Sequence, residues 1–189
     1  MTDTKYEQRL CYLVGHGDEN ALTELIQMYR HPLTAFINSI LHDYEVAEEI
    51  ALDVFVDLVC RKAEYRGESS LKTFLFSVGR NKALRHLRKN KRSSSIFCDE
   101  LQDVTSISES LEDTVERSLN KQTIHIALQQ LRPSYREVLF LLYYENMTNQ
   151  QAAVVLRKSA KQVANLSYRA KQALRTILEE KGVTGGDQW

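Results

Sequence analysis

Cysteine, proline and glycine are all scarce in this chain. Its 189 residues include three cysteines, two prolines and seven glycines. So few chain breakers predict long helices with few tight turns between them. Cys11, Cys60 and Cys98 are far apart, odd in number and outside any CxxC or Cys/His spacing. We therefore expect reduced thiols and no metal site.

Long apolar runs are also missing. No run reaches the roughly 18 residues that a membrane helix needs, so no membrane insertion is expected. The first residues, MTDTKYEQRL, lack the basic and apolar regions of a secretory signal, which predicts a cytoplasmic protein. No nucleophile–base pair, phosphate loop or metal-ligand spacing is recognisable, so the chain is not expected to be an enzyme or to hold a cofactor.

The formal net charge is zero, but the charges are segregated along the chain. Residues 1–60 carry three Lys or Arg against eleven Asp or Glu, and residues 61–92 carry eleven against two. Residues 93–120 are again acidic, with one against seven, and residues 157–181 are basic, with seven against two. Blocks of alternating sign indicate separate surfaces for separate partners, or helix faces that pair with one another.

Helical periodicity dominates the first half, and no alternating strand pattern is convincing. Asp18 is a suitable N-cap for one helix, and Pro32 suits the first turn of the next. Ser69 or Ser70 can cap the last helix of this half, which reaches about Asn90. The other expected helices span about 18–29, 32–42 and 44–63.

The periodicity stops after residue 92. The segment 93–117 is rich in Ser, Asp and Glu and has no sustained apolar face, which predicts an acidic flexible linker. Helicity resumes near Leu119, and Pro133 begins the helix PSYREVLFLLYYEN. The fold class expected is all-α: two small helical domains, 1–92 and 118–181, with a disordered tail at 182–189.

The second domain ends in a helix-turn-helix pattern. TNQQ (148–151) and SAKQ (159–162) both fit the capping box S/T-x-x-E/Q. They bracket a short helix at 149–156 and a long helix from Ala160. On the long helix, a core face is opposed by a polar face. The core face consists of Val163, Leu166, Ala170, Leu174 and Ile177, and the polar face of Lys161, Asn165, Tyr168 and Gln172.

Basic residues concentrate on the helix that follows Ser70. Seven of the thirteen residues from Arg80 to Arg92 are Lys or Arg. At 100° per residue, one stripe of this helix is cationic and suited to a phosphate backbone, where each neutralised phosphate releases counterions. We call it the basic stripe: Lys82, Arg85, Lys89 and Arg92. Tyr65, Phe74 and Phe76 stand before it and can either stack on bases or belong to the core.

The preceding helix has an acidic stripe, Glu49, Asp53 and Asp57, at four-residue spacing. Apolar residues lie on both sides of these carboxylates. One apolar side is needed for the core of the domain, so the other indicates a docked protein partner. A fully buried helix is the alternative, and the carboxylates disfavour it.

Three motifs in this order resemble extracytoplasmic-function sigma factors of the sigma-70 family. VAEEIALDVFVDL (46–58) is similar to the family's polymerase-binding helix. YRGESSLKTFLFSVGRNKALRHLRK (65–89) is similar to its −10 segment, with Phe74 where Trp is usual and Gly79 where Ala is usual. The segment from Leu131 to Arg175 is similar to its C-terminal module, with Arg157 where the turn usually has Gly.

The resemblance implies core RNA polymerase (the clamp helices of β′ and the flap of β), promoter DNA and an anti-sigma factor as partners. It implies −35 recognition by the helix-turn-helix 148–169, through Ser159, Lys161, Gln162, Asn165, Tyr168, Arg169 and Lys171. For the −10 region it implies Arg66, Ser69, Ser70, Lys72, Phe74, Arg80, Asn81, Lys82, Arg85, Arg88, Lys89 and Arg92. For core polymerase it implies Glu48, Glu49, Leu52, Asp53, Phe55, Val56 and Asp57.

A stand-alone helix-turn-helix regulator that binds operator DNA as a dimer is the main alternative. Such a regulator binds duplex DNA tightly by itself, whereas a sigma factor needs core polymerase. A helical adaptor without DNA contact is a third hypothesis, but it leaves both basic blocks without a role.

Overall fold

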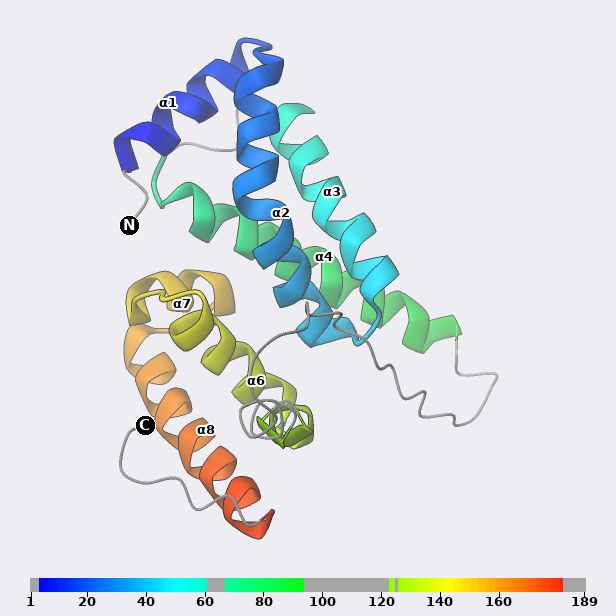
Figure 1. Ribbon diagram of the computed structural model, residues 1–189, viewed down its shortest axis with the longest axis vertical. Coiled ribbons are helices and arrows are strands. Elements are labelled where there is room, and N and C mark those ends of the chain that lie inside the picture. The colour runs from blue at the N-terminus through cyan, green and yellow to red at the C-terminus, as the bar shows by residue number, and fades with distance from the viewer. Residues whose placement is uncertain (1–3, 61–66, 94–122, 125, 182–189) are drawn as a thin grey trace, which may run out of the picture.

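The computed structural model describes residues 4–60, 67–93, 123–124 and 126–181, with side chains for all of these except 4 and 91–93, and these segments are helical with short connections (Figure 1). Residues 94–117 of the predicted linker, the tail 182–189, Tyr65, Arg66 and Cys98 lie outside the described residues. None of the described helices is long and apolar enough to cross a membrane. The described part also holds no cluster of three or more potential metal ligands.

The first module consists of α1 (Thr4–Gly15), α2 (Glu19–Leu41), α3 (Tyr44–Cys60) and α4 (Leu71–Ser93). The long helix α2 is central and packs against the other three. Asp18 caps α2 as predicted, because its carboxylate accepts the N–H groups of Asn20 and Ala21 at 2.9 and 3.0 Å. Asp43 caps α3 in the same way, accepting the Val46 N–H at 3.1 Å.

The prediction of two helices at 18–29 and 32–42 was wrong, because α2 runs through both with Pro32 inside it. Proline removes one helical hydrogen bond and crowds the preceding turn. Both halves of α2 nevertheless bury apolar side chains on one continuous face, including Leu25 before the proline and Leu33 and Ile37 after it. Core burial therefore outweighs the local cost of the proline.

Helix α4 crosses α2 closely at Gly79. A Cβ atom at this position would lie 3.0 Å from a methyl of Leu33 and 3.1 Å from a methyl of Ile37. The glycine thus sets the separation of the two helices. The buried Tyr29 hydroxyl donates to the buried Glu7 carboxylate at 2.5 Å, which joins α1 to α2.

The second module consists of a helical stretch at 126–130, α6 (Pro133–Leu139), η2 (Phe140–Tyr144), α7 (Asn149–Leu156) and α8 (Ala160–Glu180). The helix predicted to run from Pro133 through YYEN instead ends at Leu139 and continues as the π-helical turn η2. There the Glu145 N–H donates to the Phe140 carbonyl at 3.0 Å, five residues back. The extra residue in this turn changes the direction of the side chains that follow it.

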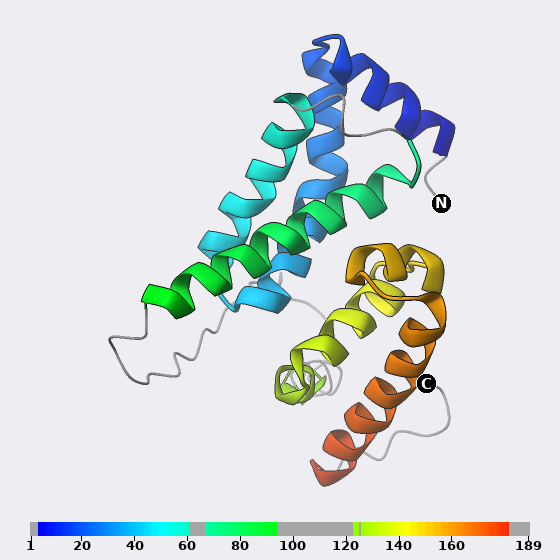
Figure 2. The same ribbon diagram turned by 180° about the vertical axis from the view of Figure 1, so that it is seen from behind.

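The two modules are in contact. Figures 1 and 2 show α6 and α7 beside α2 and α4 from both sides, and α8 on the far side of the second module. Buried apolar residues of both modules belong to one contiguous core. Cys11 is half-buried at the edge of that core; burial, helped by the Glu7 charge, raises the pKa of its thiol to about 11. Cys60, by contrast, is exposed.

Candidate nucleic-acid and polymerase interface

Both predicted capping boxes are present. The Thr148 hydroxyl accepts the Gln151 N–H at 3.2 Å, and the Gln151 side chain accepts the Thr148 N–H at 2.9 Å. Ser159 and Gln162 repeat the arrangement at 3.2 and 2.8 Å. These bonds fix the starts of α7 and α8 at the predicted positions. Ser159 and Gln162, which the resemblance assigns to −35 recognition, therefore also form the N-terminal cap of α8.

The turn between α7 and α8 depends on Arg157. This residue ends α7 with φ 55° and ψ 50°, in the left-handed region. Its N–H donates to the Val154 carbonyl at 3.3 Å, and the Lys158 N–H donates to the Ala153 carbonyl at 3.0 Å. Glycine is the usual residue for such a helix end, since it has no Cβ to crowd the backbone. The turn therefore forms here with an arginine in a conformation that glycine would adopt more easily.

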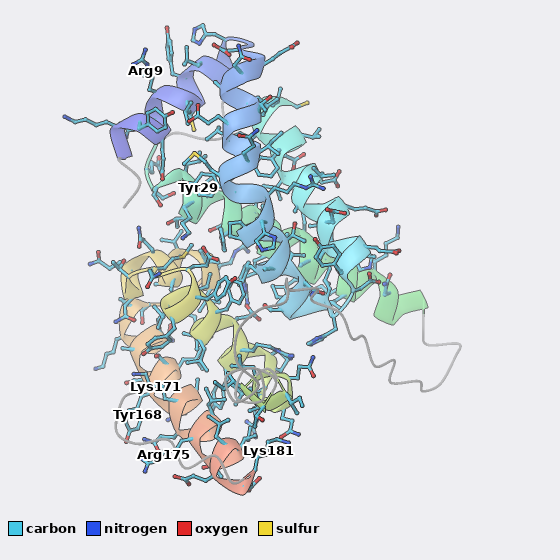
Figure 3. The ribbon with its side chains drawn as sticks, viewed as in Figure 1. Arg9, Tyr29, Tyr168, Lys171, Arg175 and Lys181 are labelled. Carbon is cyan, nitrogen blue, oxygen red and sulfur yellow. The ribbon has the colours of Figure 1, made fainter. Side chains whose placement is uncertain are left out.

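Helix α8 presents the predicted polar face to solvent. Val163 and Ala170 are buried within the second module, whereas Lys161, Asn165 and Tyr168 are exposed. Tyr168 keeps 67% of its surface exposed, and Figure 3 shows it on the outer side of α8, away from the first module. Lys161, Asn165, Tyr168 and Gln172 form what we call the recognition face. Arg169 is exposed beside it.

Lys171 is less accessible to DNA than the exposed residues Arg169 and Gln172. It is half-buried, and its ammonium lies 4.8 Å from the ring centroid of Tyr143 on η2. Burial raises the pKa of Tyr143, but hydrogen bonds from Lys171 and Ser167 and the Lys171 charge outweigh this and leave the pKa below its ordinary value. Lys171 therefore joins α8 to η2 in addition to any phosphate that it contacts.

The start of α4 clarifies the roles of its serines. The Ser70 hydroxyl accepts the Thr73 N–H at 3.2 Å and bonds to the Thr73 hydroxyl at 2.8 Å, so Ser70 rather than Ser69 is the helix cap. Phe76 is buried in the core. Of the two roles expected for the aromatic residues, base stacking or core packing, Phe76 therefore has the second. Phe74 is half-buried and packs at the edge of the core, so it is less enclosed than Phe76.

The basic residues of α4 divide into three groups. The first group, Arg85, Arg88 and Lys89, is exposed. Asn81, an uncharged residue expected on the same surface, is half-buried. Lys82 faces α3, with its ammonium 3.2 Å from Asp57 and 3.5 Å from Asp53. The backbone of Arg92 continues α4, but its side chain is not described.

Lys72 and Arg80 form the third group and face the second module. Lys72 lies 2.7 Å from a carboxylate oxygen of Glu145, and Arg80 lies 2.5 Å from Glu137. The sequence pattern gave no indication of these partners, since both glutamates are embedded in the helical stretch after Pro133. Only the packing of the two modules brings them to α4.

Helix α3 presents an apolar and acidic surface. Leu52 and Val56 are 41% and 56% exposed, and Glu49 and Asp53 are exposed beside them. We call these four residues the docking face. Phe55 is only 2% exposed, so it stabilises the core and cannot touch a partner on this face. Glu48 is half-buried and accepts a bond from Arg30 of α2 at 2.6 Å.

The fold and the motifs together define a family. Sigma-70 region 2 matches residues 25–93 and Sigma-70 region 4 matches residues 121–174. The matches together cover more than half of the chain, which belongs to the sigma-70 family and, within it, to the extracytoplasmic-function sigma factors.

Relatives extend along nearly the whole chain. It is similar to the RNA polymerase sigma-H factor of Pseudomonas aeruginosa, with 26% identity, covering 95% of this chain and 97% of that protein. It is 24% identical to the ECF RNA polymerase sigma factor SigM of Bacillus subtilis, covering 82% and 94%.

Solved structures share the fold. The sigma factor RpoE from Bartonella quintana, in complex with the anti-sigma factor NepR, matches with a TM-score of 0.71 and 20% identity, over 83% of this chain and 96% of that chain. CnrH, in complex with the cytosolic domain of CnrY, matches with a TM-score of 0.67 and 20% identity, over 93% and 98%.

Proposed function

We propose that this protein binds core RNA polymerase and directs it to a specific set of promoters, recognising and melting the −10 element with the first module and recognising the −35 element with the second. The observation that carries this proposal is the separation of surfaces within one sigma-70 chain. An exposed helix-turn-helix face, a basic helix and an apolar–acidic docking face belong to different elements.

The second module would recognise the −35 element as duplex. The N-terminal residues of a recognition helix approach the base edges of the major groove. Lys161 and Asn165 lie in that part of α8 and are exposed, so they are assigned to base contacts. Arg169 is assigned to phosphate, and Lys171 to phosphate together with its contact to Tyr143.

The first module would hold the −10 element. Ser69, Ser70 and Phe74 surround the start of α4, where a half-exposed ring beside polar groups can contact an unstacked base. Arg85, Arg88 and Lys89 lie further along the same helix and would contact the phosphate backbone. Arg66 and Arg92 are assigned to the same surface from the sequence resemblance alone.

The docking face on α3 is assigned to the clamp helices of the β′ subunit, and the second module to the flap of β. Exposed leucine and valine side chains edged by carboxylates favour a partner that offers apolar side chains and basic groups. An anti-sigma factor is proposed as a further partner, since the similar structures of RpoE and CnrH contain the anti-sigma factor NepR and the cytosolic domain of CnrY. The proposed function involves no cofactor and no catalysed reaction. The protein is proposed to act in the cytoplasm.

Run-off transcription tests the proposal. Core polymerase with this protein should produce a defined transcript from the upstream region of the protein's own gene, and core polymerase alone should not. The dimeric-regulator alternative predicts instead that the purified protein shifts a palindromic duplex tightly without polymerase. A tight, polymerase-independent shift together with no transcript would overturn the proposal.

A further inference from the structure

The π-helical turn η2 ends in two exposed tyrosines. Tyr143 and Tyr144 keep 54% and 62% of their surface exposed. The Tyr144 ring packs on Phe140 of the same turn, with 4.8 Å between the ring centroids. Tyr143 instead contacts α8, through Lys171 and Ser167. Single π-helical turns are frequent at functional sites, so a tyrosine that such a turn brings against the recognition helix is a candidate for a role in DNA binding.

Tyr143 holds Lys171 from two sides of the phenol group. The Lys171 ammonium lies 4.8 Å from the Tyr143 ring centroid, which is within the limit of about 6 Å for a cation–π attraction. The ammonium also donates to the Tyr143 hydroxyl. Ser167 is only 5% exposed and donates to the same hydroxyl, so it anchors the ring against α8.

This arrangement restrains a cation without neutralising it. On α4, Lys82 lies 3.2 Å from Asp57 and Lys72 lies 2.7 Å from Glu145, so neighbouring carboxylates balance these positive charges. The ring and hydroxyl that hold Lys171 carry no formal charge. They restrict the movement of the side chain and leave its positive charge for an anion.

Lys171 borders the recognition face. With 3.6 residues in each turn, it lies about 60° round the helix axis from Tyr168. Figure 3 shows Tyr168, Lys171 and Arg175 on neighbouring turns of α8. When the recognition face enters a major groove, a phosphate backbone lies on each side of that groove. A cation at the border of the face therefore meets backbone phosphate rather than base edges.

We propose that Tyr143 is a positioning residue for −35 binding: it holds the Lys171 ammonium at the border of the recognition face, where the ammonium contacts one phosphate of the duplex. This inference rests on the proposed function, because it takes the second module to be the one that binds the −35 duplex. Tyr143 acts through Lys171 and needs no contact of its own with DNA. Every residue that the resemblance assigned to −35 recognition lies on α8 or caps it, so η2 adds a second element to this site.

The expected contribution of Tyr143 is conformational order and not charge. A lysine side chain has many rotamers, and it loses most of this freedom when its ammonium is fixed on a phosphate. Because Tyr143 already restricts Lys171, less freedom is lost on binding. Removing the tyrosine should therefore weaken promoter binding about two- to tenfold, which is the factor for ordering one such side chain.

The test is a double-mutant cycle of Tyr143→Leu and Lys171→Gln in polymerase that contains this protein. The affinity for a fluorescein-labelled duplex of the upstream region of the protein's own gene is measured at several salt concentrations. Tyr143→Leu should weaken binding about two- to tenfold, and it should have no further effect in the Lys171→Gln background. Lys171→Gln should flatten the slope of log affinity against log salt by about 0.9, the value for one phosphate. Tyr144→Leu is the matched control and should leave the affinity unchanged, because the Tyr144 ring packs on Phe140.

A second measurement follows the contact without DNA. Burial raises the pKa of Tyr143, but the hydrogen bonds from Lys171 and Ser167 and the Lys171 charge lower it more. Lys171→Gln should therefore raise the pKa of Tyr143, measured in the free protein by NMR titration of the carbon that carries the hydroxyl. An unchanged pKa of Tyr143 would show that this residue does not hold Lys171 and would overturn the inference.

The cycle can overturn the inference in three ways. Full affinity in Tyr143→Leu, or an equal loss with and without Lys171, would show that Tyr143 does not act through the lysine. An unchanged salt slope in Lys171→Gln would show that Lys171 contacts no phosphate. If circular dichroism shows that Tyr143→Leu is unfolded, Tyr143→Phe replaces it. That variant removes only the hydroxyl, so its loss should be smaller and should again vanish in the Lys171→Gln background.

Failure of the proposed function is distinguishable from these outcomes. If the original protein gives no transcript with core polymerase, the proposed function is overturned. The pKa comparison in the free protein would still decide whether Tyr143 holds Lys171.

Discussion

At the scale of single residues, Arg157 shows how a local conformation overrides a residue preference. This sequence has an arginine where the family's turn usually has glycine, and Arg157 adopts a φ of 55°. A left-handed conformation costs a residue with a Cβ about 1–2 kcal/mol relative to the right-handed one. The rest of the turn stays intact because the capping box of Ser159 and Gln162 starts α8 two residues later.

Replacing Arg157 by glycine should therefore stabilise the protein. We expect Arg157→Gly to raise the free energy of unfolding, measured in urea, by about 0.5–1 kcal/mol, since the strain relieved exceeds the entropy lost by the glycine. Arg157→Ala is the control, because it removes the same charge and keeps the Cβ. Equal stabilities of the two variants would show that charge, rather than backbone strain, determines the effect.

At the scale of elements, most helix positions were predictable because their signals are local. Asp18, the two capping boxes and the apolar spacing of α8 each depend on residues within one or two turns, and all are found as expected. The continuous α2 and the π-helical turn η2 were not predictable. The first depends on packing that offsets Pro32, and the second on a hydrogen bond from Glu145 to Phe140 that no sequence pattern signals.

The docking face of α3 makes a prediction that concerns one element. Val56→Asp should weaken binding to core polymerase by about 1–3 kcal/mol, because it places a charge in the apolar part of the contact. The stability of the free protein should hardly change, since Val56 is already 56% exposed. Fluorescence titration of labelled protein with core polymerase measures the first quantity, and urea unfolding measures the second.

A matched control for this surface is Tyr12→Asp. Tyr12 is an exposed apolar residue on α1, outside the docking face. Reversing the charges of Asp53 and Asp57 is a poorer test, because both contact Lys82 and their reversal would place three cations together. Full affinity in Val56→Asp would remove α3 from the polymerase contact.

The recognition face makes the second prediction for an element. Asn165→Ala should change which −35 bases are tolerated, at about 1–3 kcal/mol per base contact, because Asn165 is exposed near the start of α8. Arg169→Ala, expected to remove a phosphate contact, should weaken all promoters alike. Transcription from a set of promoters with single −35 substitutions distinguishes the two patterns. A uniform loss in Asn165→Ala would assign that residue to positioning.

At the scale of the whole molecule, the charge blocks were visible in the sequence but their pairing was not. The acidic and basic blocks left two interpretations open, separate partners or helix faces that pair with one another. Lys82 pairs with Asp53 and Asp57, and Lys72 and Arg80 pair with Glu145 and Glu137. The first pairing joins two helices of one module, and the second joins residues of different modules. Both depend on how elements far apart in the chain pack, which spacing along one helix cannot reveal.

This pairing makes a prediction about the basic stripe under the proposed function: exposed cations should release counterions when promoter DNA binds, and Lys82 should release few. A phosphate contact changes the slope of log affinity against log salt by about 0.7–0.9 for each cation involved. Arg85 is exposed, so Arg85→Ala should flatten the salt dependence of promoter binding by polymerase containing this protein by about that amount. Lys82→Ala should flatten it less, because Asp53 and Asp57 already balance the Lys82 charge at 3.5 and 3.2 Å.

A salt titration of open-complex formation compares the two variants directly, and each serves as the control for the other. They remove one positive charge apiece from the same face of α4, so a general loss of positive potential affects both equally. Equal flattening would mean that Lys82 leaves Asp53 and Asp57 when the complex forms. Because Asp53 belongs to the docking face, that result would connect polymerase binding on α3 to DNA binding on α4 through a single lysine.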